Sequence, residues 1–131
     1  MTTIASHKDR LAAWIRAREL TSGFELDYPT FLKSMNPLSV SDGSWLRLPK
    51  DFVTKYLPEE DEIITLIDKE KNEFKTNYMA KKRGTLYGGW KEFAIAHNLE
   101  DGDILVFRLI RPLVFEVLII RVDATKQWGY D

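Results

Sequence analysis

The chain has 131 residues, of which 44% are hydrophobic and 12% are aromatic, and this is enough for one domain with a substantial buried core. It has no cysteine and only two histidines, which excludes disulfide scaffolds, thiolate zinc sites and histidine-rich metal sites, so we expect neither a metal ion nor another cofactor. The formal net charge of −1 gives no general attraction to nucleic acid, so any such function must be indicated by local patterns of charge.

The sequence does not predict a membrane segment. The longest apolar run, residues 113–120, contains Glu116 and is far shorter than the ~20 residues that span a bilayer. The N-terminus lacks the apolar core of a signal peptide. We therefore expect a soluble intracellular protein that does not bind a membrane.

A helix is predicted near the N-terminus, over about residues 7–21. Residues 6–9 resemble a capping box, and Gly23 is placed to end the helix. An apolar stripe follows at roughly helical spacing and comprises Leu11, Trp14, Ile15 and Leu20. Such a stripe usually packs against a core, but on a helix outside the main domain it could instead hold a protein partner or a second copy of the chain.

Beyond Pro29 the periodicity becomes that of strands, in an order that corresponds to about seven strands without an internal repeat. Six of these strands can be delimited, over residues 30–35, 45–48, 61–67, 73–78, 104–110 and 114–122, with a polar loop over 36–44. Two short helices, over about 50–57 and 90–97, interrupt them after Pro49 and Gly89. This pattern predicts a mainly antiparallel, partly closed barrel in which Trp90 is buried.

Positive charge is concentrated between residues 69 and 83, which hold six Lys or Arg residues and two Glu residues. At the end of this segment, Lys81, Lys82 and Arg83 follow a strand-like stretch, and glycines then lead back to a tryptophan. The pattern indicates a projecting loop that binds a polyanion. A solvated hairpin tip is the commoner fate of three adjacent charges, and a short nuclear-import patch is a further alternative.

A series of short motifs runs from about Pro29 to Val122. They are Phe31-Leu32-Lys33 and Asn36-Pro37, then Leu48-Pro49-Lys50 and Tyr56-Leu57-Pro58, then Gly89-Trp90 with Phe93, and finally Leu99, Gly102-Asp103 and Val106-Phe107. In this order and at these spacings the motifs resemble a plant B3 DNA-binding domain. The tracts over residues 45–49 and 115–121 are most similar to the reproductive-meristem and related branch of that family.

The resemblance implies a fold of the mainly β class, an open seven-stranded pseudobarrel of the B3 type with two short helices. On this chain it would occupy residues 29–123, after an N-terminal helical extension over 1–28 and before a tail over 124–131. It also implies a nuclear transcription regulator without catalytic activity, which grips the major groove of double-stranded DNA with two loop arms. A two-stranded ribbon fits a major groove, and Lys or Arg on it can meet guanine edges or phosphates.

On this chain the first arm would cover about residues 33–44 and the second about residues 78–85. The mapping gives candidate DNA contacts at Lys33, Asn36, Ser39, Ser41, Asp42 and Ser44 in the first arm, and at Lys75, Met79, Lys81, Lys82, Arg83 and Thr85 in or beside the second. The best-understood branches of the family carry Trp, Asn, Ser and Gln in the second arm, whereas three cations here favour phosphate over base contacts. Asp42 would repel phosphate unless it accepts from a cytosine amino group. We therefore expect DNA binding that is sensitive to salt and modestly selective for sequence.

Several of these residues also have a purely structural interpretation. Lys33 borders a strand and could be a charge that protects a sheet edge, while Asn36 could cap a turn before the following proline. Lys75 could simply lie on the polar face of its strand. His97 is expected to be a packed or capping residue rather than a catalyst.

Two functions of other classes compete with DNA binding. Asp61 or Asp68 with Glu73 and Lys75 matches the acid and Glu-x-Lys pattern of metal-dependent nucleases, but this common triplet has no other catalytic signal beside it. Alternatively, the chain could be a protein-interaction module that keeps the B3 fold but has little DNA affinity. In that case the N-terminal helix or an edge of the barrel would recruit a partner.

Overall fold

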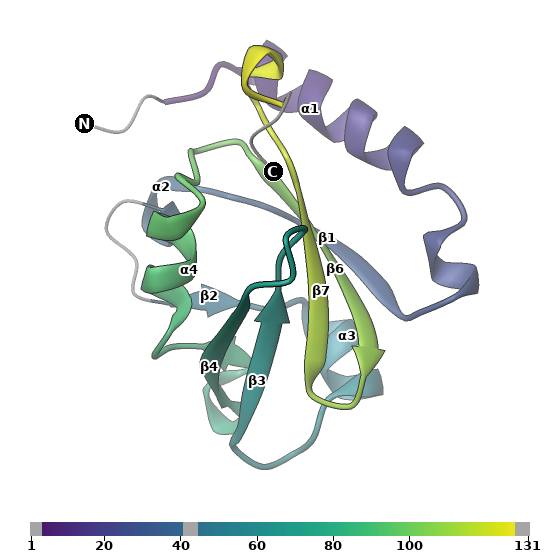
Figure 1. The fold of residues 1–131 in the computed structure, drawn as a ribbon, viewed down its shortest axis with the longest axis vertical. Helices are drawn as coiled ribbons and strands as arrows, with labels where there is room; N and C mark the ends of the chain where they lie inside the picture. Colours follow the sequence, from purple (N-terminus) through teal and green to yellow (C-terminus); the bar gives the residue numbers. More distant parts are fainter. Residues whose placement is uncertain (1–3, 41–44, 128–131) are drawn as a thin grey trace.

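Seven strands form one curled sheet that is open on one side, as the computed structural model of residues 4–40 and 45–127 shows (Figure 1). The order across the sheet is β1-β6-β7-β3-β4-β5-β2. The strands are β1 (Thr30–Ser34), β2 (Leu46–Arg47), β3 (Glu62–Ile67), β4 (Glu73–Met79), β5 (Thr85–Leu86), β6 (Ile104–Arg111) and β7 (Val114–Ile120). All neighbouring strands are antiparallel except β3 and β7, which run parallel. The expected mainly β pseudobarrel is confirmed.

Within residues 4–40 and 45–127, four α-helices and three short 3-10 helices accompany the sheet. They are α1 (His7–Leu20), η1 (Phe24–Leu26), α2 (Pro37–Val40), α3 (Lys50–Tyr56), η2 (Ala80–Lys82), α4 (Trp90–Ala96) and η3 (Ala124–Lys126). The helices predicted after Pro49 and Gly89 are therefore present as α3 and α4. In the described part of the chain, none of the helices is long and apolar enough to cross a membrane.

The main core lies inside the curled sheet and is rich in aromatic side chains. Phe31 of β1 stacks on Phe107 of β6 at 4.7 Å between ring centroids, and Phe52 of α3 meets the Phe31 ring edge-on. On α4, Trp90 and Phe93 are both fully buried. The expected burial of Trp90 is confirmed. Helices α3 and α4 both close the inside of the barrel.

The shortest elements are the ones that the sequence pattern does not resolve. Strand β5 has only two residues, too few to show an alternation of polar and apolar side chains. The stretch expected to be a polar loop over residues 36–44 contains the short helix α2. Strand β2 is likewise shorter than the predicted 45–48. These differences all fall in or beside the two expected arms.

Gly89 allows α4 to begin in direct contact with β4. Its φ angle is +95°, in the left-handed region that favours glycine. A Cβ atom at this position would lie 2.0 Å from the carbonyl oxygen of Lys75. A glycine is therefore required where the chain turns from the second arm into α4.

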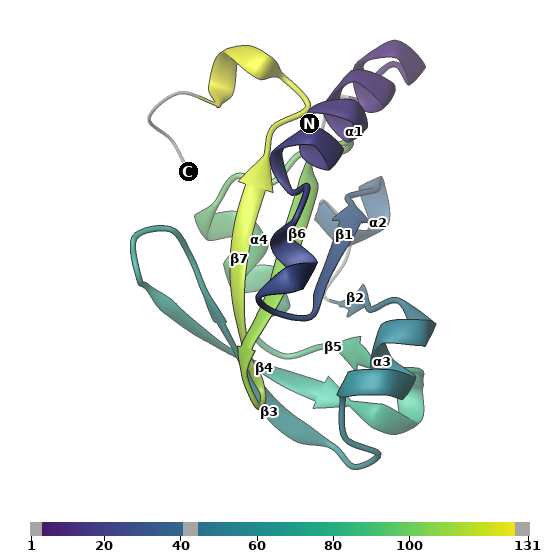
Figure 2. The same ribbon diagram turned by 90° about the vertical axis from the view of Figure 1, so that its right-hand side faces the viewer.

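Helix α1 covers the outer face of β6 and β7 with a different side from the one expected (Figure 2). Its buried residues are Ala13 and Ala17, which pack with half-buried Trp14 against Ile104, Val106 and Ile120. Leu11, Ile15 and Leu20 are instead exposed, so of the two alternatives for the stripe, packing on the core holds only for Trp14.

The rotation of α1 has a physical explanation. Two alanines let the helix backbone approach the strands closely. Arg10 pairs with buried Asp101, and the Arg16 guanidinium donates to the carbonyl oxygen of Arg121 at 2.6 Å. Close packing and these polar ties together outweigh the burial of the larger aliphatic side chains.

Candidate nucleic-acid interface

The second arm carries its positive charge on an exposed turn between β4 and β5. Lys81 and Lys82 lie in η2, Arg83 follows directly, and all three side chains are exposed. Arg83 has a left-handed conformation (φ 61°), which turns the chain back toward β5. We call these three residues the basic tip.

Two hydrogen bonds hold the ends of this turn. The backbone N–H of Ala80 donates to Oδ1 of Asp61 at 2.8 Å, and the Thr85 hydroxyl donates to the carbonyl oxygen of Lys82 at 2.5 Å. Asp61 precedes β3, so it ties the start of the turn to the neighbouring strand. The Asp61 carboxylate and the Thr85 hydroxyl therefore fix the turn, and the side chains of the three cations take no part in these two bonds.

The base of the second arm packs tightly on the barrel. Gly84 (φ +69°) lies against α3 so closely that a Cβ atom there would be 2.4 Å from a Val53 methyl group. The backbone N–H of Leu48 donates to the Gly84 carbonyl oxygen at 3.0 Å. Fully buried Tyr78 donates from its hydroxyl to the Pro58 carbonyl oxygen at 3.3 Å. Burial, helped by the Asp61 carboxylate, raises the pKa of Tyr78 and keeps this donor protonated.

The other candidates in or beside the second arm are placed differently from the basic tip. Lys75 and Asn77 are on the exposed face of β4, where the Lys75 ammonium donates to the Thr65 hydroxyl at 3.0 Å. Met79 is half-buried, and Thr85 is buried. The structure thus brings Lys81, Lys82 and Arg83 together at the surface and places Thr85 beneath them.

In the first arm, Asn36 and Ser39 are bonded to each other. Asn36 Oδ1 accepts from the Ser39 backbone N–H at 3.0 Å, and the Ser39 hydroxyl accepts from the Asn36 backbone N–H at 3.1 Å. Ser39 is buried, and its carbonyl oxygen accepts from the Trp90 indole N–H at 3.0 Å. The interpretation of Asn36 as a turn cap is correct, while its exposed side chain remains open to a ligand.

Lys33 lies at the open edge of the sheet, on the side of the first arm. Burial, and secondly the positive charge of Arg47, lower the pKa of this half-buried lysine. Arg47 is exposed on β2, opposite Thr85 of the second arm, and its guanidinium lies 5.9 Å from the centroid of the Trp45 ring. An anion between the two arms would relieve the repulsion between these cations.

Three further candidates belong to the first arm. Ser41, Asp42 and Ser44 lie outside the residues that the structure describes. Their proposed contacts with DNA stay predictions from the sequence.

Three residues belong to this surface that sequence reasoning did not select. Arg47 alternates with buried Leu46 and Leu48, so its outward direction was readable from the period of the strand. Asp61 contacts Ala80, and Val53 contacts Gly84. Both contacts join residues far apart in the sequence, so no local pattern predicts them.

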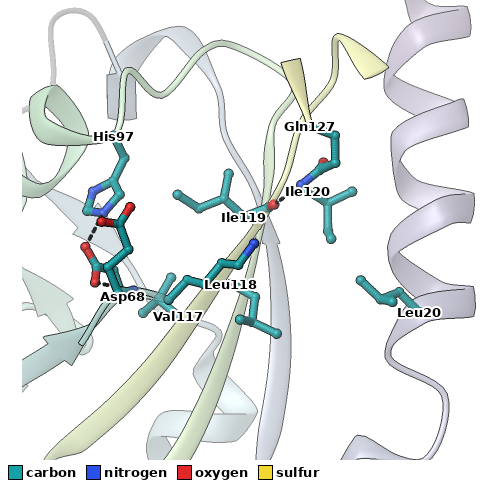
Figure 3. Close-up of a pocket in the computed structure, with 10 residues that line it drawn as sticks. Leu20, Asp68, His97, Val117, Leu118, Ile119, Ile120 and Gln127 are labelled. Atoms are coloured by element: carbon teal, nitrogen blue, oxygen red, sulfur yellow. Dashed lines mark hydrogen bonds and ion pairs between the residues drawn. The ribbon is translucent and has the colours of Figure 1, made fainter. Parts of the chain in front are cut away.

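A pocket of about 190 Å³ lies on the other side of the molecule, where the end of β3 diverges from β7 (Figure 3). His97 points at Asp68 across one wall, with 3.0 Å between Nε2 and a carboxylate oxygen, and its Nδ1 lies 2.8 Å from the Phe93 carbonyl oxygen. Burial opposes ionisation of Asp68, but hydrogen bonds from His97 and Asn72 prevail and lower its pKa. This pair joins the β3–β4 turn to α4, in agreement with the expected packed histidine.

Most of the chain matches a known protein family. The model of the B3 DNA binding domain matches residues 31–123 of the chain. The chain belongs to the B3 DNA-binding domain family.

Relatives of this B3 domain occur in plants. A B3 domain-containing protein of Oryza sativa subsp. japonica is 49% identical over 120 residues, which cover 92% of this chain and 50% of the relative. The chain spans about half the length of this and a second rice relative. The similarity therefore concerns one part of these longer proteins.

Solved structures support the B3 fold. A hypothetical Arabidopsis thaliana protein superimposes with a TM-score of 0.60 and 24% identity, over 69% of this chain and 87% of the other. The Arabidopsis FUS3–DNA complex gives a TM-score of 0.52 and 22% identity, over 70% of this chain and 95% of the other. At these identities the likeness concerns the fold.

Proposed function

We propose that this B3 domain acts in a nuclear transcription regulator and binds the major groove of double-stranded DNA through its two arms. The observation that carries the proposal is the basic tip, three exposed cations on a tightly anchored turn in a chain whose formal net charge is −1. Membership of a DNA-binding family and likeness in fold to a protein–DNA complex support it. The DNA-binding part is residues 29–123, with a helical extension over 1–28 and a tail over 124–131.

The two arms have different roles in this proposal. The basic tip neutralises phosphates, which makes binding sensitive to salt and only modestly selective. Lys33 and Asn36 reach base edges, together with Ser41, Asp42 and Ser44, and Arg47 binds a phosphate between the arms. Lys75 and Met79 flank the bound duplex, whereas Ser39 and Thr85 position their neighbours.

A selection from random duplexes at two salt concentrations tests this function. We expect enrichment of a short motif at the higher salt concentration and nearly indiscriminate binding at the lower one, because phosphate contacts dominate when few counterions are present. Failure to retain any duplex at low salt would contradict the proposal.

We do not propose an enzyme. The nuclease pattern needs one of the two acids beside Glu73, but Asp61 lies at the end of β3 remote from Glu73 and accepts from the Ala80 backbone N–H. The oxygens of Asp68 accept from the backbone N–H groups of Glu70 and Asn72 and contact His97. Lys75 is bonded to Thr65. A cleavage assay with magnesium and duplex DNA should give intact DNA, and metal-dependent cleavage would overturn this part of the proposal.

A second function is favoured by the exposed side of α1. Leu11 and Ile15 are 51% and 49% exposed on the outside of a helix that is firmly docked by its other side. We propose that α1 holds a protein partner or a second copy of the chain. A B3 fold with little DNA affinity, acting only as an interaction module, is the alternative that the duplex selection would reveal.

A further inference from the structure

The outward side of α1 is a continuous stripe opposite the docked one. Helical spacing places five exposed residues on it, and we call these the outer face: Lys8, Leu11, Ala12, Ile15 and Glu19. The docked side is formed by Ala13, Ala17 and partly buried Trp14. The outer face is thus apolar in the middle and carries one charge at each end.

The two end charges have the opposite signs to those that the helix macrodipole favours. Lys8 is in the first turn and Glu19 is in the last, whereas the helix macrodipole favours acids at the start and bases at the end. Asp9 and Arg18 follow the usual preference, but they lie beside the outer face rather than on it. A partner that brings an acid to Lys8 and a base to Glu19 would therefore stabilise both ends of α1.

We propose that the outer face binds the outer face of a second copy, with the two α1 helices antiparallel about a two-fold axis. In that arrangement Lys8 of each copy meets Glu19 of the other, and the small side chain of Ala12 receives Ile15 of the other. A parallel arrangement would place Lys8 beside Lys8 and Glu19 beside Glu19, so the order of charges selects the antiparallel one.

The expected association is weak, because the contact is small. A 14-residue helix with two half-exposed aliphatic side chains buries less than the ~1,200 Å² of stable complexes. The pairing should therefore appear only at high protein concentration, or where other parts of a longer protein hold two copies together.

Pairing and DNA binding use different sides of the molecule. Helix α1 lies on the outside of β6 and β7, at the upper right of Figure 1, whereas the turn after β4 lies at the lower left. The pairing rests on the α1 function proposed above and gives that helix a specific occupant. It is independent of DNA contact, so the two can fail separately.

Exchange of the end charges tests the pairing. By sedimentation equilibrium, Lys8→Glu and Glu19→Lys should each weaken self-association about tenfold, because each puts two like-charged contacts into the dimer. An equimolar mixture of the two variants should recover wild-type association as a heterodimer, since its contacts are again between opposite charges. The double variant Lys8→Glu/Glu19→Lys should recover it alone.

Controls separate this result from general effects of charge and folding. Lys91→Glu makes the same change of charge on the exposed side of α4 and should associate like the wild type. Helical content and duplex affinity should be equal to wild type in the double variant, whose net charge is unchanged. A wild type that stays monomeric at millimolar concentration, or single variants that the mixture does not rescue, would overturn the antiparallel pairing.

Discussion

The two arms differ in what their polar side chains are bonded to. In the second arm, hydrogen bonds from the Ala80 N–H to Asp61 and from the Thr85 hydroxyl to a backbone carbonyl hold the turn and leave the three cations of the basic tip exposed. In the described part of the first arm, Asn36 and Ser39 bind each other, and Ser39 is fixed to Trp90 in the core. The second arm is therefore built to display charge, and the first to hold a few groups at a set position above the core.

The largest effect should come from breaking the link between the first arm and the core. Trp90→Ala should lower the free energy of unfolding by ~3–5 kcal/mol, because it removes a large aromatic side chain that is fully buried. Trp90→Phe keeps much of the apolar contact but leaves the Ser39 carbonyl oxygen without its indole donor. Urea unfolding should give a smaller decrease for Trp90→Phe, and unchanged stability of Trp90→Ala would contradict the assigned core.

The first arm should govern selectivity more than affinity. Lys33→Ala should cost ~1–3 kcal/mol on the selected duplex and much less on a scrambled one, as expected for a contact with a base edge. Asn36→Ser, which keeps an oxygen to cap the Ser39 N–H, should behave in the same way without a loss of folding stability. Equal decreases in affinity on both duplexes would show that this arm, too, binds only phosphates.

The effect of Asp61→Ala on DNA affinity distinguishes a positioning role of this acid from a purely electrostatic one, because the two roles predict changes of opposite sign. Asp61→Ala removes an acid beside the basic tip, so charge alone predicts tighter DNA binding. The Ala80 N–H would lose its acceptor, however, and we expect a loosened tip and affinity weaker by about 1 kcal/mol. Glu60→Ala, at an exposed acid next in the chain, is the control and should bind slightly more tightly. Tighter binding by both variants would show that Asp61 does not position the tip.

An effect of similar size, but dependent on pH, concerns the Asp68–His97 pair far from either arm. Hydrogen bonds lower the pKa of Asp68 in the folded state despite its burial, so its stabilising contribution is present above the unfolded pKa and is lost as pH falls through the folded one. Asp68→Asn should lower stability by about 1 kcal/mol at neutral pH, and the difference from wild type should disappear in acid. Urea midpoints measured from pH 7 to pH 2 would show this. A constant difference would refute the linkage, and duplex affinity at pH 7 should not change.

Features that depend on local periodicity can be predicted from the sequence, whereas contacts between residues far apart in the chain cannot. Trp90 and the outward direction of Arg47 follow from local periodicity, which a single segment displays. The bond from Ala80 to Asp61 joins residues 19 positions apart, and only the folded sheet brings them together. The docked side of α1 does not follow from hydrophobicity, because two alanines pack more closely on β6 and β7 than larger side chains can. The small size of these alanines and the long-range bonds of Arg10 and Arg16 determine which side of α1 is docked.

The most direct test of the DNA-binding surface is a salt titration of Lys81→Ala/Lys82→Ala/Arg83→Ala on selected and scrambled duplexes. We predict a folded protein that binds both duplexes more weakly than wild type by a similar factor, because phosphate contacts carry no sequence information. The slope of log affinity against log salt should become shallower by ~0.9 for each phosphate that the variant no longer neutralises. Lys8→Ala/Arg18→Ala/Lys69→Ala removes the same charge from exposed positions away from the arms and should keep the wild-type slope. If the basic-tip variant instead binds like the wild type at every salt concentration, the tip is only a solvated turn and the proposed DNA-binding surface is wrong.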